Sequence, residues 1–171
     1  MNVRPETAAD HGAIHRIVSD AFGAAGEADL IGRLRADGDL LLSLIAEQDG
    51  VVIGHVAFSR LWIEDGDRRI AGVSLAPVAV DAAHRRKGIA QALIEDGHRR
   101  LHAGGETIAF VLGDPAYYGR FGYSAASAQG FSCDYAGPYF QALALASGAP
   151  DHGRAVYADA FERLSERIGA A

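Results

Sequence analysis

Three consecutive segments in the first half of the chain are dominated by Val, Ile, Leu and Phe. They are residues 40–47, 51–63 and 70–80. Asp49-Gly50 and Asp65-Gly66 separate them, and an Asp-Gly pair between two apolar runs favours a tight hairpin turn. The pattern therefore predicts three antiparallel strands joined by hairpins. The third strand contains Pro77, which has no N–H to give, so we expect its pairing to be interrupted there by a bulge or an edge.

Before these strands, the apolar positions follow the period of a helix. Residues 7–22 predict a first amphipathic helix, with Thr7 or Asp10 as its N-cap. Glycines at 23 and 26 interrupt the pattern. Residues 27–35 then predict a second, short helix that ends near Gly38.

After the strands, residues 88–103 again show helical spacing, with Ile89, Leu93, Gly97 and Leu101 on one face and Gly104-Gly105 at the end. Residues 107–112 form a short apolar run typical of a strand. A strand, helix, strand sequence predicts that residues 78–80 run parallel to residues 108–112, in a mixed sheet. We further expect one or two helical turns at 116–121 and late strands at 140–146 and 154–157.

Composition limits the classes of protein that fit this pattern. A chain of 171 residues with 49% apolar content suits one domain over residues 1–171. The net charge of −6, with basic clusters only at 84–87 and 98–100, argues against nucleic acid and leaves room for a small polyanion. The N-terminal residues lack the apolar core of a signal peptide, and no apolar run is long enough for a membrane, so we expect a cytoplasmic protein. Cys133 is the sole cysteine, which excludes an internal disulfide and a multi-cysteine metal site.

The segment with the clearest chemistry is residues 78–90, where a strand ends in a basic loop that opens a helix. The first N–H groups of a helix are unpaired and carry partial positive charge, and Gly88 and Ala90 keep side chains out of the way. This arrangement suits a pyrophosphate. The glycine patterns of the NTPase phosphate loop and of dinucleotide-binding folds are absent from the sequence.

The spacing Arg85-x-x-Gly88-x-Ala90 resembles the coenzyme A pyrophosphate loop of the GNAT superfamily, and the predicted order of elements is also that of GNAT proteins. Residues 112–123, Leu-Gly-Asp-Pro-Ala-Tyr-Tyr-Gly-Arg-Phe-Gly-Tyr, further resemble a signature of its YhbS-like group, as do Glu27, Gly54-His55 and residues 153–157. The chain departs from the usual pattern at three positions. Ala82 stands where a proline is usual, Arg86 stands where a glycine is common, and Asp114 lies near a position where many GNAT enzymes carry asparagine.

The resemblance implies an α/β fold of the α+β type: a mixed, mostly antiparallel sheet with a splayed parallel strand pair and flanking helices. It implies an acetyl-CoA-dependent N-acetyltransferase in which a primary amine attacks the thioester directly, without a metal. The residues that would bind the cofactor are Val78, Ala79, Val80, Arg85, Arg86, Lys87, Gly88, Ile89 and Ala90. Among them, a backbone N–H near Val78 or Ala79 would stabilise the charge on the carbonyl oxygen.

The resemblance also suggests catalytic residues. Tyr118 precedes Gly122-Tyr123 with the spacing of GNAT enzymes that use a tyrosine to protonate the thiolate, whereas its neighbours Tyr117, Phe121 and Tyr123 suit the core. A base must deprotonate the amine, yet residues 70–80 hold no carboxylate. Glu27 and His55 are the remaining candidates for this base, and we favour Glu27. The alternative for Glu27 is a solvent-facing carboxylate in the first turn of its helix. The alternative for His55, which we favour, is a histidine packed on its strand with one satisfied nitrogen.

Two other functions stay open at this point. A non-catalytic acyl-CoA-binding module would keep the pyrophosphate loop but need neither acid nor base, and a partner-binding domain would keep only the fold. The expected partner is a small-molecule or peptide amine, with no nucleic acid and no membrane. The sequence does not identify that amine, and it leaves a homodimer open.

Overall fold

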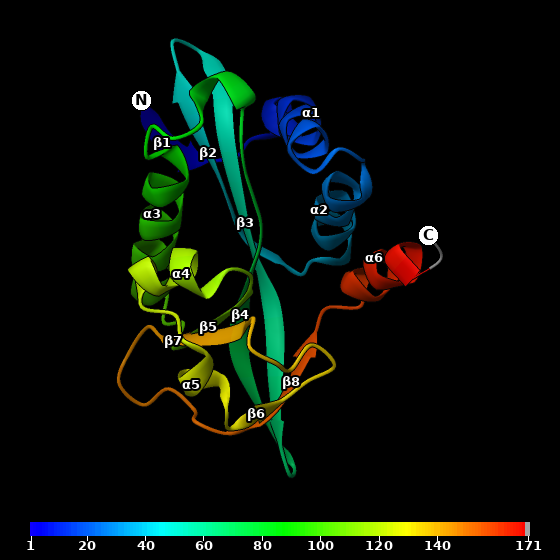
Figure 1. Cartoon of the computed structure of the whole chain (residues 1–171), viewed down its shortest axis with the longest axis vertical. Coiled ribbons are helices and arrows are strands. Elements are labelled where there is room, and N and C mark those ends of the chain that lie inside the picture. The colour runs from blue at the N-terminus through cyan, green and yellow to red at the C-terminus, as the bar shows by residue number, and fades with distance from the viewer. Residues whose placement is uncertain (170–171) are drawn as a thin grey trace. The chain divides into compact units, whose positions relative to one another are not determined.

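The computed structural model describes residues 1–169 of the chain (Figure 1), with side chains up to residue 164. The strands are β1 (Asn2–Pro5), β2 (Leu40–Gln48), β3 (Val51–Asp65), β4 (Arg68–Val80), β5 (Ile108–Leu112), β6 (Phe131–Ser132), β7 (Phe140–Ala144) and β8 (Gly153–Tyr157). The α-helices are α1 (His11–Phe22), α2 (Gly26–Asp37), α3 (Ile89–Ala103), α4 (Pro115–Tyr118), α5 (Ala125–Ala128) and α6 (Ala160–Gly169). Short 3₁₀ turns are η1 (Ala8–Asp10), η2 (Ala82–His84) and η3 (Gly119–Phe121).

The sheet confirms the predicted fold class. Its strands follow the order β1-β2-β3-β4-β5-β7, and β8 pairs with β3 and β6. The first hairpin turns where the sequence predicts it, because Asp49 and Gly50 both take left-handed backbone angles, with φ of 51° and 77°. The second turn consists of Gly66 and Asp67, one residue later than expected, since β3 extends through Asp65.

The chain divides into two compact units. The first contains Met1–Ser59, Pro77–Gly97 and the residues from Ala158 onward, and the second contains Arg60–Ala76 and His98–Tyr157. The strands β3 and β4 and the helix α3 each continue from one unit into the other. One domain over residues 1–171 stays a prediction.

In the first unit, helices cover both faces of the strands. Figure 1 shows α1 and α2 on one side of β2 and β3, and α3 on the other. The core beneath α1 and α2 consists of Ile14, Ile17, Val18, Ala28, Ile31, Ile45, Val52, Ala57 and Ala79. On the α3 side, a Cβ at Gly97 would lie 2.3 Å from the ring of Phe58, so only glycine lets the helix approach this closely. The predicted apolar face of α3 is therefore confirmed.

In the second unit, β4 and β5 are parallel, but the pairing differs from the predicted one. The paired residues run from Val73 and Ala109 to Leu75 and Val111, whereas we expected residues 78–80. The parallel ladder thus ends two residues before Pro77, whose missing N–H removes a donor from any continuation. On its other edge β5 pairs antiparallel with β7. Phe110 of β5 stacks on Phe140 of β7, and both rings belong to the core of this unit.

Four elements were missing from the sequence-based prediction, namely β1, α5, β6 and α6. The helical turns after Pro115 and the two late strands agree with it to within a few residues. Within the described part of the chain, no helix is both long and apolar enough to cross a membrane.

Candidate active site

The loop that joins β4 to α3 is organised by Asp81. Its carboxylate accepts a hydrogen bond from the amide of Ala83 at 3.2 Å and contacts Nδ1 of His84 at 2.8 Å. The contact with His84 is the main cause that lowers the pKa of Asp81 below its ordinary value. The carboxylate therefore stays ionised at neutral pH and fixes the turn η2 that leads into the basic residues.

Arg86 and Gly88 in this loop both have left-handed backbones, with φ of 62° and 76°. Glycine adopts this conformation without penalty, whereas an L-residue with a side chain loses roughly 1–2 kcal/mol. The structure thus explains why a glycine is usual where this chain carries Arg86. Both residues are exposed, and a Cβ on Gly88 would meet no atom within 4 Å.

Two further cations fold back on the loop. Nε of Arg85 donates to the carbonyl of Val80 at 3.3 Å, and Nζ of Lys87 donates to the carbonyl of Ala83 at 3.2 Å. Both side chains are exposed. The loop therefore gathers three positive charges within three consecutive residues at a solvent-facing position, as an anion site requires.

The start of α3 adds directional donors to this charge. The first backbone hydrogen bond of the helix runs from the amide of Ala92 to the carbonyl of Gly88, at 3.0 Å. The amides of the preceding helical residues, from Ile89 onward, lie at the end where a helix has no internal acceptors. Buried Ile89 anchors this end on β3, because a Cβ at Gly54 would lie 2.8 Å from its Cγ2 atom. The sequence-predicted loop and helix start therefore bring exposed cations and unpaired helix amides together, and anion binding there stays a prediction.

The end of β4 precedes this loop in the same unit. Ala79 is buried in the core beneath α1 and α2, while Val78 and Val80 are half-buried. The amide of Asp81 donates to the carbonyl of Ile53 at 2.9 Å, which ties the strand end to β3. Residues 78–80 thus lie beyond the last residue of β4 that pairs with β5, which is Leu75.

Tyr118, the predicted acid, belongs to the second unit and ends α4. Burial raises the pKa of its hydroxyl to about 12, with a smaller contribution from Tyr117. The phenol is therefore protonated at any physiological pH. The carboxylate of Asp114 caps α4 by accepting a hydrogen bond from the amide of Ala116 at 2.9 Å.

The neighbouring aromatic residues have the packing role expected of them. Tyr123 is 3% exposed, its hydroxyl contacts Nε2 of His98 at 2.8 Å, and its ring lies edge to face with that of Tyr118. Tyr117 and Phe121 are half-buried and contact each other edge to face. These rings support Tyr118 on several sides.

Glu27 lies in the first turn of α2 and is half-buried. Asp29 is the other acidic residue of this turn, and its carboxylate contacts His15 at 3.1 Å. A carboxylate here interacts favourably with the helix dipole whatever else it does. Glu27 belongs to the same unit as the loop of residues 85–88, and its role as a base stays a prediction.

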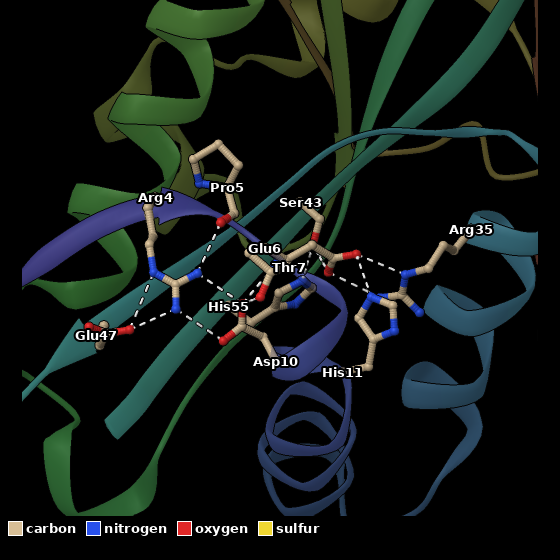
Figure 2. A network of polar contacts seen from close by, with 10 residues as sticks. All are labelled: Arg4, Pro5, Glu6, Thr7, Asp10, His11, Arg35, Ser43, Glu47 and His55. Atoms are coloured by element: carbon tan, nitrogen blue, oxygen red, sulfur yellow. Dashed lines mark hydrogen bonds and ion pairs between the residues drawn. The ribbon is translucent and has the colours of Figure 1, made fainter. Parts of the chain in front are cut away.

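A buried polar network, which the sequence analysis did not predict, lies in the first unit (Figure 2). His55 is fully buried, and its Nε2 atom is 2.7 Å from Oγ of Ser43, while its Nδ1 atom has no hydrogen-bond partner. Oγ of Ser43 also donates to Glu6. The side chain of Arg35 donates to both oxygens of Glu6, at 2.8 and 3.0 Å. The expectation of a packed histidine with one satisfied nitrogen is thus confirmed.

A second charged cluster adjoins this network in Figure 2. Arg4 donates to both oxygens of Asp10, at 2.9 and 3.1 Å, and to Glu47 at 2.7 Å. The hydrogen bond from Arg4 is the main cause that lowers the pKa of Asp10. These pairs tie β1 and η1 to β2.

Cys133 is half-buried, and burial raises the pKa of its thiol. A reactive thiolate is therefore disfavoured. Among the side chains that the structure describes, up to residue 164, no three of His, Cys, Asp or Glu are grouped so that they could hold a metal ion.

Comparison with known proteins identifies the family. Residues 2–126 match the model of the GNAT acetyltransferase domain. The chain is 38% identical over 152 residues to the uncharacterized N-acetyltransferase YhbS of Escherichia coli (strain K12), covering 87% of this chain and 90% of that protein. It is also 33% identical over 126 residues to the uncharacterized N-acetyltransferase YjhQ of the same strain, covering 71% and 69%.

Solved structures agree with this result. The crystal structure of YhbS from Escherichia coli in complex with CoA matches with a TM-score of 0.86 and 35% identity, over 95% of this chain and 92% of that one. A GNAT family acetyltransferase from Brucella melitensis, in complex with acetyl-CoA, matches with a TM-score of 0.79 and 34% identity, over 94% and 97%. With a family match over residues 2–126 and a relative 38% identical over most of both chains, this chain belongs to the GNAT family of acetyltransferases.

Proposed function

We propose that this acetyltransferase moves the acetyl group of acetyl-CoA to a primary amine by direct attack of the amine on the thioester. The observation that supports this most strongly is the geometry of residues 85–90, where exposed cations precede the unpaired amides of α3. Relatives of similar length have been solved with CoA and with acetyl-CoA, which is the cosubstrate we propose here.

The cofactor would be held through its pyrophosphate and its pantetheine arm. Arg85, Arg86 and Lys87 would neutralise phosphate charge, and the amides of Gly88, Ile89 and Ala90 would donate to phosphate oxygens. The pantetheine amides would pair with the backbone of Val78 and Val80, past the end of the parallel ladder at Leu75. A backbone N–H at Val78 or Ala79 would stabilise the negative charge that builds on the thioester oxygen.

The reaction moves protons as well as the acetyl group. An alkyl amine with a pKa of about 10.4 is an ammonium ion at neutral pH and must lose a proton before it attacks. We assign this step to Glu27. When the tetrahedral intermediate collapses, the C–S bond breaks and the thiolate takes a proton, which we assign to the hydroxyl of Tyr118. Its raised pKa keeps that hydroxyl protonated until the thiolate forms.

The proposed acceptor is a small-molecule or peptide amine, and the proposed location is the cytoplasm. A net charge of −6 favours the approach of a cationic amine acceptor over that of an anionic one. A homodimer stays compatible with this proposal.

The test combines acetyl-CoA with four classes of amine: polyamines, amino acids, aminoglycosides and lysine peptides. Release of free thiol and mass gain of the acceptor are measured together, with a parallel calorimetric titration of acetyl-CoA. We expect binding, and thiol release that depends on one class of amine. Binding without amine-dependent release would identify a non-catalytic acyl-CoA-binding module, and failure to bind would favour a domain that retains only the fold.

A further inference from the structure

Half-buried Glu6 and the buried residues Ser43 and His55 form a continuous chain of hydrogen bonds. Glu6 follows β1, Ser43 lies on β2, and His55 lies on β3. Ser43 is in the middle, with its Oγ atom bonded to Glu6 on one side and 2.7 Å from Nε2 of His55 on the other. Figure 2 shows the three side chains close together at the N-terminal end of α1.

The positions of the hydrogens follow from what each group can donate. Burial raises the pKa of Glu6, but hydrogen bonds from Arg35 and Ser43 outweigh it, so the net pKa is lowered and Glu6 is a carboxylate at neutral pH. A serine has one hydrogen to donate, and here Glu6 receives it. Ser43 must then accept from His55, which places the ring hydrogen on Nε2 and leaves a lone pair on Nδ1.

This order of residues differs from that of a nucleophilic triad. There the histidine lies between the acid and the serine, so that it can activate the hydroxyl. Here the serine lies between the acid and the histidine, and it is only 6% exposed. The arrangement does not create a nucleophile. It connects two proton acceptors, namely Nδ1 of His55 at one end and the carboxylate of Glu6 at the other.

The lone pair on Nδ1 of His55 is buried and unpartnered, although buried polar atoms are nearly always paired. Burial lowers the pKa of the ring to about 4, so the ring is neutral at pH 7 and a lasting imidazolium would be costly. A proton can reach Nδ1 only if the proton on Nε2 leaves at the same time. Ser43 provides that exit.

The position of His55 in the sheet connects it to the proposed site. On β3 it lies between β2, which carries Ser43, and β4, whose end carries residues 78–80. The hydrogen bond from Asp81 to Ile53 ties that end of β4 to β3 two residues before His55. Ala79 and Ile45, the partner of His55 in the ladder, both belong to the core beneath α1 and α2.

We propose that His55, Ser43 and Glu6 form a proton relay that removes the proton lost by the amine nitrogen as its bond to the acetyl carbon forms. Nδ1 of His55 accepts that proton, Nε2 releases its own to Oγ of Ser43, and Ser43 passes its hydrogen to the carboxylate of Glu6. No bond other than these N–H and O–H bonds changes, and the ring is neutral before and after. This inference rests on the proposed function.

The groups around Glu6 complete the path. His11 on α1 lies 3.4 Å from Oε1 of Glu6, and its side chain is 39% exposed, so it provides a route to solvent. Arg35 on α2 holds the carboxylate in place through two hydrogen bonds. The neighbouring cations and acids of the adjoining cluster, Arg4, Asp10 and Glu47, are paired with one another.

The experiment interrupts the relay at its centre. Ser43→Ala removes the connecting hydroxyl and leaves both ends in place. Ser59→Ala is the matched control, because Ser59 is a fully buried serine on the same strand as His55 and its hydroxyl has no hydrogen-bond partner. With the acceptor found in the screen, we expect Ser43→Ala to lower kcat on the order of 10²-fold, within the usual range for positioned proton transfer. Acetyl-CoA affinity and the kcat of Ser59→Ala should stay at the wild-type level.

A merely structural role for Ser43 is separated by solvent isotope measurements. When kcat is plotted against the fraction of D2O in the solvent, the wild type should give a curved line, because more than one proton moves in the step. The same plot for Ser43→Ala should be a straight line. Nitrogen-15 NMR of the wild-type imidazole provides a second test that needs no variant. We expect His55 to be neutral and protonated on Nε2 at pH 7.

Three results would overturn the inference or its basis. Full kcat in a folded Ser43→Ala variant with a straight wild-type plot would disprove the relay while leaving acetyl transfer intact. A ring protonated on Nδ1 at pH 7 would disprove it as well, since no acceptor would remain. Acetyl-CoA binding by a wild-type chain that acetylates no amine would instead refute the proposed function, and the relay with it.

Discussion

The ring of Tyr118 lies directly against the backbone of Gly113, so that a Cβ on that glycine would be 2.4 Å from Cε2 of the ring. Gly113 is fixed in turn by β7 and the residue before it, because its amide donates to Tyr139 and its carbonyl accepts from buried Gln141 at 3.0 Å. The end of β5 therefore serves as a platform for the proposed acid. The Gly-Asp-Pro-x-Tyr-Tyr pattern thus begins with glycine because a larger residue at that position would collide with the ring of the second tyrosine.

Replacing Gly113 with alanine should displace Tyr118. A backbone-fixed Cβ at 2.4 Å cannot be accommodated without moving the ring, and such overpacking costs about 1–3 kcal/mol of stability. We expect kcat to fall as far as in Tyr118→Phe, and the combined variant to fall no further, because both changes remove one function. Gly119→Ala is the control, since a Cβ there meets nothing within 4 Å. Independent, additive losses would show that Gly113 acts separately from Tyr118.

Tyr118→Phe keeps the ring and removes the hydroxyl alone. A thiol with a pKa of about 8.5 is a fair leaving group, so we expect a loss of kcat on the order of 10²-fold, the low end for a general acid, with acetyl-CoA affinity intact. The raised pKa of about 12 means that wild-type Tyr118 stays protonated up to pH 10. The ratio of wild-type to variant kcat should therefore be constant between pH 7 and pH 10. A Phe variant with full kcat would leave Tyr118 as a packing residue.

Gly88→Ala should weaken acetyl-CoA binding without unfolding the protein. Its φ of 76° disfavours a side chain, so the loop must distort or bear strain, yet no neighbour clashes with the new Cβ. Gly105→Ala is a matched control at the opposite end of α3, where φ is 90° and space is equally open. We expect similar losses of melting temperature in both variants, and a loss of affinity of at least about tenfold, or 1.4 kcal/mol, in Gly88→Ala alone. Equal affinities in calorimetry would exclude this loop as the pyrophosphate site.

Glu27→Gln should lower kcat/KM for the amine if Glu27 receives the proton of the ammonium ion. The deficit should shrink as the pH approaches the amine pKa of about 10.4, because the amine then binds already deprotonated. Asp29→Asn is the control, since it removes the same charge from the same helical turn. A pH profile for Glu27→Gln that superimposes on the wild type would show that another base, or water, performs this step.

The fold follows from the sequence wherever the signal is local. The Asp49-Gly50 turn, the glycines that end α1 and α2, and the apolar face of α3 all depend on neighbouring residues, and each agrees with the structure. The strand β1 could not be predicted from the sequence, because its four residues include Arg4 and Pro5 and show no alternation of apolar and polar positions. It exists through its pairing with β2, where Val3 lies opposite Ala46. The displaced parallel register of β4 and β5 is likewise a long-range property.

The relay shows why part of the site is hidden from sequence reasoning. Continued without interruption from its turn, the first hairpin would pair His55 with Leu44, and His55 and Ser43 would then face opposite sides of the sheet. A bulge between Ala46 and Glu47 shifts the register by one residue, so His55 lies opposite Ile45 and shares a face with Ser43. The composition of these strands does not predict that shift of register.

The burial of neutral His55 predicts a pH dependence of stability. Its folded pKa of about 4 lies below the ordinary value of about 6.5, so between these values the unfolded chain binds a proton that the folded chain does not. The free energy of unfolding should thus fall as the pH drops from 6.5 toward 4, by about 3 kcal/mol in all at 1.36 kcal/mol per unit of pKa. In urea titrations, His55→Gln should flatten this slope between pH 5 and pH 6.5, above the range where Glu6 and Asp10 are protonated.

His152 provides a control of opposite sign, because hydrogen bonding to Asp151 raises its pKa, and the stability it contributes is lost as the pH rises above 6.5. His152→Gln should leave the acid slope unchanged. An acid slope that persists unchanged in His55→Gln would show that other groups cause it, and that the pKa of His55 is not lowered in the folded protein.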